Sequence, residues 1–181
     1  MTYTEEDNRF LASFCASPRG ELGFLSEPFS LGDHTCATDG KQTLFRPGPY
    51  PRTLDKKHVT RLMLEHLDVM PTAQQPLKAL DIRPVSYRTC PECKGNGDIT
   101  FSSPLNHYTA TCKTCDGDGT IEHRHIISLT ENNVTLRFDS TTLYNVLQHD
   151  PEATYALSRG YLCFVSARFC GLITREQESD E

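Results

Sequence analysis

The chain has 181 residues, of which 37% are hydrophobic and 23% charged, and its formal net charge is -6 at pH 7. This length suits one ordinary domain with an insertion, and the hydrophobic fraction is enough for a modest core. The negative charge excludes a whole-protein field that attracts nucleic acid, although a local basic patch is compatible with it.

The sequence also argues against a membrane or secreted protein. No apolar run approaches the roughly 18 residues of a membrane span. The N-terminal stretch MTYTEEDNRF is acidic and polar, without the basic start and apolar segment of a signal peptide. We therefore expect a cytoplasmic protein with no membrane partner.

The first part of the chain predicts a helix and then a hairpin. Thr4 and Asp7 have capping-box spacing, and the apolar residues that follow fall on one helical face. Asp39-Gly40, between two strand-like runs, is a strong hairpin signal. The spacing in LDKKHVTRLMLEHL predicts a second helix capped by Asp55.

The polar side of this second helix carries three cations, Lys56, Lys57 and Arg61. Cations in the first turn are disfavoured by the helix dipole. One interpretation is an ordinary solvated face, and the other is a small patch of nucleic-acid contacts that follows phosphates.

An eight-residue phrase, C-x-x-C-x-G-x-G, then occurs twice, as CPECKGNG and CKTCDGDG. Zinc prefers four ligands in a tetrahedron, and each C-x-x-C turn can aim two thiolates at one ion. We therefore predict one zinc ion bound by Cys90, Cys93, Cys112 and Cys115. The glycines Gly95, Gly97, Gly117 and Gly119 would let the backbone curl beneath the sulfurs.

Other residues near the repeat leave two interpretations open. From Arg88 to His125 there are four basic and five acidic residues, a net charge of -1 that suits phosphate poorly. The loop between the turns carries three apolar side chains, which either hold the loop over the zinc site by packing or bind a partner: Phe101, Leu105 and Tyr108. The remaining cysteines, Cys15, Cys36, Cys163 and Cys170, are expected to be small buried hydrophobes.

Nothing in the sequence indicates an enzyme. His123 and His125 lie on one side of a predicted strand, either as a polar face or as ligands of a metal. We find no catalytic triad, H-E-x-x-H or phosphate-binding loop, and four cysteine ligands leave zinc no open position. We expect a protein without enzymatic activity.

The C-terminal part predicts a hairpin at Asn132-Asn133, a helix over STTLYNVLQ capped by Asp139 or Ser140, and a last hairpin at Arg159-Gly160. The preceding stretch LKALDIRPVSY is expected to be extended. The fold class is thus α+β, with antiparallel hairpins and two to three helices carrying an inserted zinc-ribbon finger. We predict a body at 1–87 and 121–173, a finger at 88–120 and a disordered acidic tail at 174–181.

The repeated phrase resembles the DnaJ-type cysteine-rich domain over residues 88–122. That family has four copies and two zincs, so two copies here imply one zinc. Two-copy versions are also similar to zinc modules of phage antitermination proteins and small assembly chaperones. The motif mix therefore resembles phage or prophage accessory proteins, which implies a bacterial host.

A second resemblance involves the body. HTCATDGKQTLFR is similar to the strand-turn-strand of a DNA sliding clamp domain, and TTLYNVLQ with YLCFVSARFCGLI resembles the helix and closing strands of a bacterial clamp's last domain. This implies a clamp-like body with room for one such domain.

These observations lead to one main functional hypothesis. The chain is predicted to be a zinc-binding adaptor that presents its finger to a protein partner of the replication, transcription or defence machinery. One alternative is a DNA-binding, clamp-like protein, and the other is a small chaperone that holds unfolded chains. An oligomer is compatible with the exposed hairpin edges.

Overall fold

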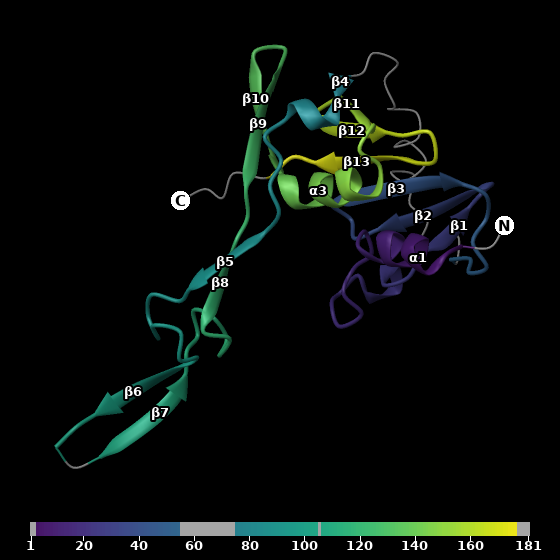
Figure 1. The fold of residues 1–181 in the computed structure, drawn as a ribbon. Helices are drawn as coiled ribbons and strands as arrows, with labels where there is room; N and C mark the ends of the chain where they lie inside the picture. The colour runs from purple at the N-terminus through teal and green to yellow at the C-terminus, as the bar shows by residue number, and fades with distance from the viewer. Residues whose placement is uncertain (1–2, 55–74, 105, 177–181) are drawn as a thin grey trace. The chain divides into compact units, whose positions relative to one another are not determined.

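The computed structural model describes residues 3–54, 75–104 and 106–176. The chain folds into two compact units (Figure 1). We call the first the body, Met1–Ile82 with Ile126–Glu181, and the second the finger unit, Arg83–His125. The predicted second helix, with Lys56, Lys57 and Arg61, lies outside the described residues, as do Leu105 and residues 177–181.

The body is built on one seven-stranded sheet with the order β1-β2-β3-β13-β12-β11-β4. Every pairing between these strands is antiparallel. The strands are β1 Phe29–Leu31, β2 His34–Thr38, β3 Gln42–Pro47, β4 Gln75–Pro76, β11 Thr154–Ser158, β12 Tyr161–Val165 and β13 Cys170–Thr174.

Two α-helices are described in the body, and each is preceded by a residue whose side chain caps it. In α1 (Glu5–Ala12) the Thr4 hydroxyl accepts from the Asp7 amide, while the Asp7 carboxylate accepts from the Thr4 amide, so the predicted capping box is confirmed. In α3 (Ser140–His149) the Asp139 carboxylate accepts from the Thr141 amide at 2.8 Å.

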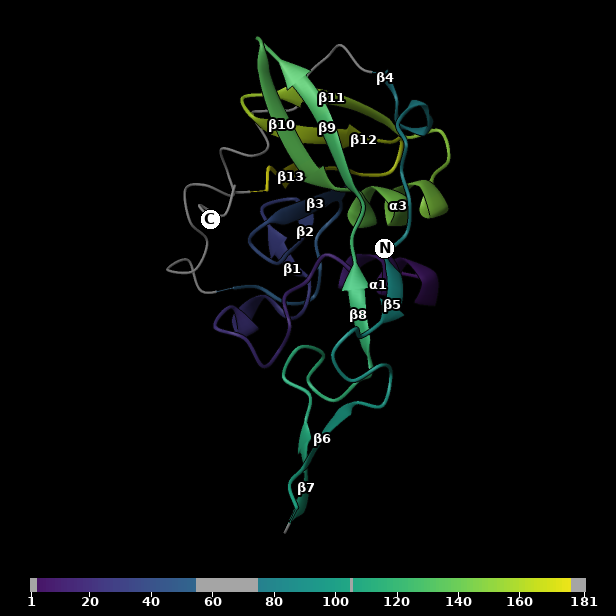
Figure 2. The ribbon, with the colours of Figure 1, turned by 90° about the vertical axis from the view of Figure 1, so that its left-hand side faces the viewer.

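Six of the seven strands form two similar halves, and β4 pairs at one edge. Helix α1 is followed by the meander β1-β2-β3, and α3 is followed by the meander β11-β12-β13. The halves join where β3 pairs with β13, in the register Cys170 to Phe45 and Ile173 to Gln42. Figure 2 shows this seam between the blue and yellow strands, with both helices beside the sheet.

Side-chain alternation gives the sheet two buried faces. Ala37 and Leu44 point toward the helices, while their neighbours Cys36 and Phe45 point to the opposite face. The main core lies on the helix face and receives residues from both helices, from the turn after α1 and from the sheet: Leu11, Leu143, Val146, Phe14, Ala37, Leu44, Leu162, Phe164 and Ile173. Each fully buried Leu or Phe contributes about 1.5–3 kcal/mol relative to exposure.

Three of the scattered cysteines, Cys36, Cys163 and Cys170, lie away from the main core, whereas Cys15 packs against it. Cys36 and Cys163 are fully buried, and Cys15 and Cys170 are partly buried. Burial raises the pKa of Cys36 to about 12 and that of Cys163 to about 11. These thiols therefore stay protonated and behave as small apolar side chains.

A separate hairpin completes the body. It pairs β9 (Ile126–Glu131) with β10 (Val134–Asp139) and turns at Asn132 and Asn133, both at positive φ, as the sequence predicted. Ile127, Leu136 and Phe138 join the main core from this hairpin.

Two short 3-10 helices, η1 (Gly23–Leu25) and η2 (Leu77–Ala79), also occur. The second corrects the expectation of an extended stretch at LKALDIRPVSY, because Leu77 is fully buried and the chain turns to place it.

The first residues of the predicted acidic tail have ordered contacts with the body. Strand β13 includes Thr174, and the amide of Glu176 donates to the carbonyl of Arg137 at 2.7 Å.

The finger unit contains two small antiparallel sheets. One pairs β5 (Ser86–Thr89) with β8 (Thr120–His123), and the other pairs β6 (Asp98–Ser102) with β7 (His107–Thr111). Each copy of the repeated phrase connects a strand of one sheet to a strand of the other. Across the described residues the fold is thus mostly antiparallel sheet with two α-helices, an α+β or mainly β class.

Candidate metal centre

The four predicted ligands come together in the finger unit. The Sγ atoms of Cys90, Cys93, Cys112 and Cys115 all lie within 4.8 Å of one another, and all four side chains are buried. Cys90 and Cys112 are 3.8 Å apart between sulfurs, and Cys93 and Cys115 are 3.6 Å apart. A tetrahedral zinc with Zn–S bonds of about 2.3 Å has edges of about 3.8 Å. The sulfur spacing therefore fits one tetrahedral ion.

The two turns are related by an internal repeat of 22 residues. Each short sulfur contact joins residues 22 positions apart. The backbone bonds are reciprocal, because the Cys90 amide donates to Gly119 and the Cys112 amide donates to Gly97, both at 2.8 Å. Ile99 and Ile121, which occupy matching positions, pack against the cluster. The finger unit is thus two copies of one turn, packed face to face around the sulfurs.

The second glycine of each phrase makes this close approach possible. A Cβ on Gly97 would lie 2.2 Å from the carbonyl oxygen of Gly117, and one on Gly119 would lie 2.3 Å from that of Gly95. Both residues also have positive φ, at 78° and 74°. Any side chain at either position would push the two turns apart.

A hydrogen bond that the sequence analysis missed also joins the turns. The Thr114 hydroxyl donates to the Glu92 carboxylate at 2.6 Å, and these residues are again 22 positions apart. The same carboxylate lies 3.9 Å from the Cys112 sulfur. Their matching positions within the two phrases, just before the second cysteine of each, could have revealed the pair.

Backbone amides around the sulfurs favour the thiolate form at one ligand. Burial opposes ionisation of Cys93, but hydrogen bonds from the Gly97 and Gly95 amides outweigh it and lower its pKa to about 7. At Cys115 burial prevails and raises the pKa to about 12, although the Gly119 amide donates to its sulfur at 3.3 Å. An ion that binds all four thiolates must therefore displace protons.

The two histidines considered as metal ligands do not join this cluster. His123 lies in β8 opposite Ser86, and neither His123 nor His125 belongs to the group of close metal-ligating atoms found among the described residues. Lys56, Lys57 and Arg61 fall in the range 55–74, outside the part of the chain that the structure describes.

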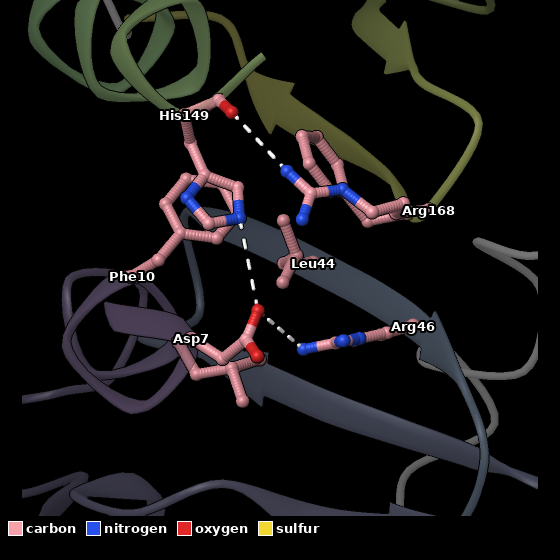
Figure 3. A pocket seen from close by; sticks show the side chains of 8 residues that line it. Asp7, Phe10, Leu44, Arg46, His149 and Arg168 are labelled. Atoms are coloured by element: carbon pink, nitrogen blue, oxygen red, sulfur yellow. Dashed lines mark hydrogen bonds and ion pairs between the residues drawn. The ribbon is translucent and has the colours of Figure 1, made fainter. Parts of the chain in front are cut away.

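Apart from the cysteine cluster of the finger unit, the body contains a cluster of charged and polar side chains that the sequence did not predict (Figure 3). The buried carboxylate of Asp7 forms an ion pair with Arg46 at 2.7 Å, and His149 Nε2 lies 3.9 Å from the same oxygen. The imidazole stacks on Phe10 with ring centroids 4.0 Å apart. Arg168 donates to the His149 carbonyl at 3.3 Å. We call these residues (Asp7, Arg46, His149 and Arg168) the Asp7 cluster.

The Asp7 cluster ties α1, β3 and the end of α3 together. Hydrogen bonds from Thr4 and the charge of Arg46 outweigh desolvation and lower the pKa of Asp7. Burial, aided by the Arg168 charge, lowers the pKa of His149. Removal of one partner would leave a buried charge uncompensated, and the contacts here join three elements of one core.

Comparison of the chain with protein-family models, with curated proteins and with solved structures finds no match. Across the described ranges, no helix is long and apolar enough to cross a membrane.

Proposed function

We propose that this protein is a zinc-binding adaptor without enzymatic activity, which presents its finger unit to a protein partner. The observation that carries the proposal is the buried four-cysteine cluster, with sulfur spacing that fits one tetrahedral ion. A zinc held by four thiolates has no open position for water or substrate, so its contribution is folding energy. The centre then serves to hold the shape of the finger unit.

Exposed aromatic side chains support the second half of the proposal. Phe101 and Tyr108 stack across β6 and β7 with centroids 5.0 Å apart, yet they are 44% and 61% exposed. Tyr87, on β5, is 66% exposed. Aromatic residues are enriched at the centres of protein interfaces.

The charge of the finger unit favours protein over nucleic acid as the partner. Arg83–His125 holds five basic residues (Arg83, Arg88, Lys94, Lys113 and Arg124) and five acidic ones (Glu92, Asp98, Asp116, Asp118 and Glu122), a net charge of zero. Phosphate binding gains its affinity from an excess of cations, which this unit lacks. The phage or prophage context, and a partner in replication, transcription or defence, rest on the resemblance of the motifs alone.

Capture of the partner by cross-linking tests this proposal. The zinc-loaded chain should cross-link to a defined protein from its host, and Tyr108→Ser or Cys93→Ser should abolish the product. Val134→Ser is the matched control, because Val134 is an exposed apolar residue of the body at 52% exposure. A product that persists in both finger variants, or that is lost in the Val134 variant alone, would refute the adaptor role.

A DNA-binding, clamp-like function is the second candidate. The observation that favours it is the body's construction from two helix-plus-meander halves joined at β3 and β13. In the described part, however, the first turn of α1 exposes Glu5 and Glu6, which repel phosphate. The test is retention of the chain on a DNA duplex at low salt. Retention that Lys57→Ala and Arg61→Ala weaken would support this candidate, and no retention would remove it.

A further inference from the structure

The hairpin of β6 and β7 has two outer edges. In the part of the chain that the structure describes, each of these strands pairs only with the other. Nine of their ten residues are exposed, and the tenth, Ile99, is half-buried. A strand edge in this state presents backbone N–H and C=O groups to any chain that can pair with it.

The backbone hydrogen bonds at the two ends of the hairpin show which residues face outward. The Cys112 amide donates to Gly97, and Ser103 and Asn106 exchange two bonds, so the hydrogen-bonded pairs follow at every second position. The backbone of Phe101 is therefore hydrogen-bonded to that of Tyr108, and the backbone of Ile99 to that of Ala110. The backbone groups of the residues between them point away from the hairpin: Asp98, Thr100 and Ser102 on β6, and His107, Thr109 and Thr111 on β7.

The edge of β7 lacks the features that usually protect such strands. Natural edge strands carry Lys, Pro, inward-pointing charges or bulges that block pairing with another chain. β7 reads HYTAT and contains no Asp, Glu, Lys, Arg or Pro. β6 differs, because Asp98 stands at the start of its edge. The threonines of β7 also favour the extended conformation.

The two faces of the hairpin differ in polarity. Ile99, Phe101, Tyr108 and Ala110 share one face, and the other face carries Thr, Ser, His and Asp side chains. A strand added beside β7 would continue both faces, with alternate side chains next to Tyr108 and Ala110. A charged side chain placed there would lose water without gaining a partner.

We propose that β7 binds an extended, uncharged segment of the partner protein by strand addition. This inference rests on the proposed adaptor function and names its binding mode. Main-chain hydrogen bonds from His107, Thr109 and Thr111 supply affinity, and the apolar face selects segments with apolar side chains at alternate positions. The segment would pair with about five residues of β7.

A second copy of the chain fits this edge less well. A stable interface between two folded proteins uses about 20–30 residues on each side, whereas β7 offers five. Single-stranded nucleic acid would stack on Phe101 and Tyr108, but such sites combine stacking with a positively charged groove. Neither β6 nor β7 contains a lysine or arginine, so the two strands that hold the stacked rings supply no cation for a phosphate.

The test uses a blocked peptide of alternating valine and threonine, flanked by one lysine at each end for solubility. It is titrated into the full, zinc-loaded chain and followed by amide NMR spectra and hydrogen exchange. Binding should shift the amides of His107, Thr109 and Thr111 and slow their exchange. A peptide of alternating glutamate and threonine should bind at least about tenfold more weakly, because its charges would be desolvated.

Two matched proline variants separate the two edges. Thr109→Pro removes an outward N–H of β7 and leaves the bonds to β6 intact, and Thr100→Pro does the same on the edge of β6. Thr109→Pro should weaken the Kd for the peptide about tenfold or more, and Thr100→Pro should leave it unchanged. One zinc per chain in both variants confirms that the finger unit is folded.

Several results would overturn the inference. These are no peptide binding by the wild-type chain, equal effects of the two proline variants, or a monomer–dimer equilibrium that Thr109→Pro abolishes. The last outcome would identify a second copy as the occupant. If the peptide does not bind while cross-linking to a host protein still depends on Tyr108, the adaptor function stands and strand addition is wrong.

Discussion

At the scale of single residues, the metal centre depends on glycines as much as on cysteines. The thiols bind an ion only if the two turns come close enough, and Gly97 and Gly119 set that distance through contact with the facing carbonyl oxygens. The phrase C-x-x-C-x-G-x-G therefore predicts both the ligands and the reason for the second glycine. It does not reveal that the two copies face each other.

The Gly97→Ala variant tests this role. The added methyl would clash with the backbone of Gly117, so we expect loss of zinc and of the finger unit's dispersed amide signals. Gly160→Ala is the control, because Gly160 also has positive φ, at 82°, but nothing lies within 4 Å of its Cβ position. That variant should lose only about 1–2 kcal/mol of stability and keep its zinc. Full zinc in Gly97→Ala would contradict the close-packed turns.

The Asp7 cluster leads to a prediction about pH. His149 has a lowered pKa in the folded chain, so the unfolded chain takes up its proton first as the pH falls below about 6.5. The free energy of unfolding should therefore be highest above that pH and decline as the pH falls below it. Below about 3.8 the lowered pKa of Asp7 adds a further loss.

His149→Gln should flatten the decline that begins below about pH 6.5, as measured by urea unfolding at several pH values. The groups that face His149 are Glu6 and Asp7 from α1, Arg46 from β3 and Arg168. If the variant shows the same pH dependence as the wild type, His149 is not the responsible group.

At the scale of elements, local signals were sufficient for turns and helix starts but not for the sheet. The capping box at Thr4 and the turns at Gly40 and Asn132 follow from residue chemistry within a few positions. The seam of β3 with β13 joins residues more than 120 positions apart, and no local pattern specifies that pairing or its register. The contact of Asp7 with His149 depends on the same long-range packing.

Gly171, in β13, makes the seam testable. A Cβ at this position would lie 2.2 Å from the ring of Phe164 and 2.4 Å from the carbonyl oxygen of Thr43, in the strand next to it. Gly171→Ala should destabilise the body by about 1–3 kcal/mol, as overpacking does. Gly20→Ala is the control, because its Cβ would make only an ordinary contact of 3.6 Å. If Gly171→Ala and Gly20→Ala have the same midpoint of urea unfolding, the close packing of Gly171 between β12 and β3 is wrong.

At the scale of the whole molecule, the two units have different sources of stability. The body has an extended hydrophobic core, whereas the buried side chains described in the finger unit are those of the four cysteines, with Ile99 and Ile121 beside them. Such a small cluster cannot offset the entropy of ordering some 40 residues, so the ion must supply the difference. Structural zinc provides about 10–16 kcal/mol of apparent binding energy.

Removal of the metal should therefore unfold one unit only. With a strong chelator and a reductant, we expect amide signals of residues 83–125 to collapse toward random-coil positions, while signals of the body remain dispersed. Added zinc should restore the spectrum. A chelated chain whose finger unit keeps its amide dispersion and slow hydrogen exchange would show that metal does not hold the unit together.

The metal content of the purified chain is the most direct test of the central claim. Native mass spectrometry under reducing conditions, with elemental analysis of the same sample, should find one zinc per chain. Cys93→Ser and Cys112→Ser should each lose it, whereas Cys163→Ser, which alters a buried cysteine of the body, should retain it. Less than half an equivalent of zinc in the wild-type chain would contradict the account.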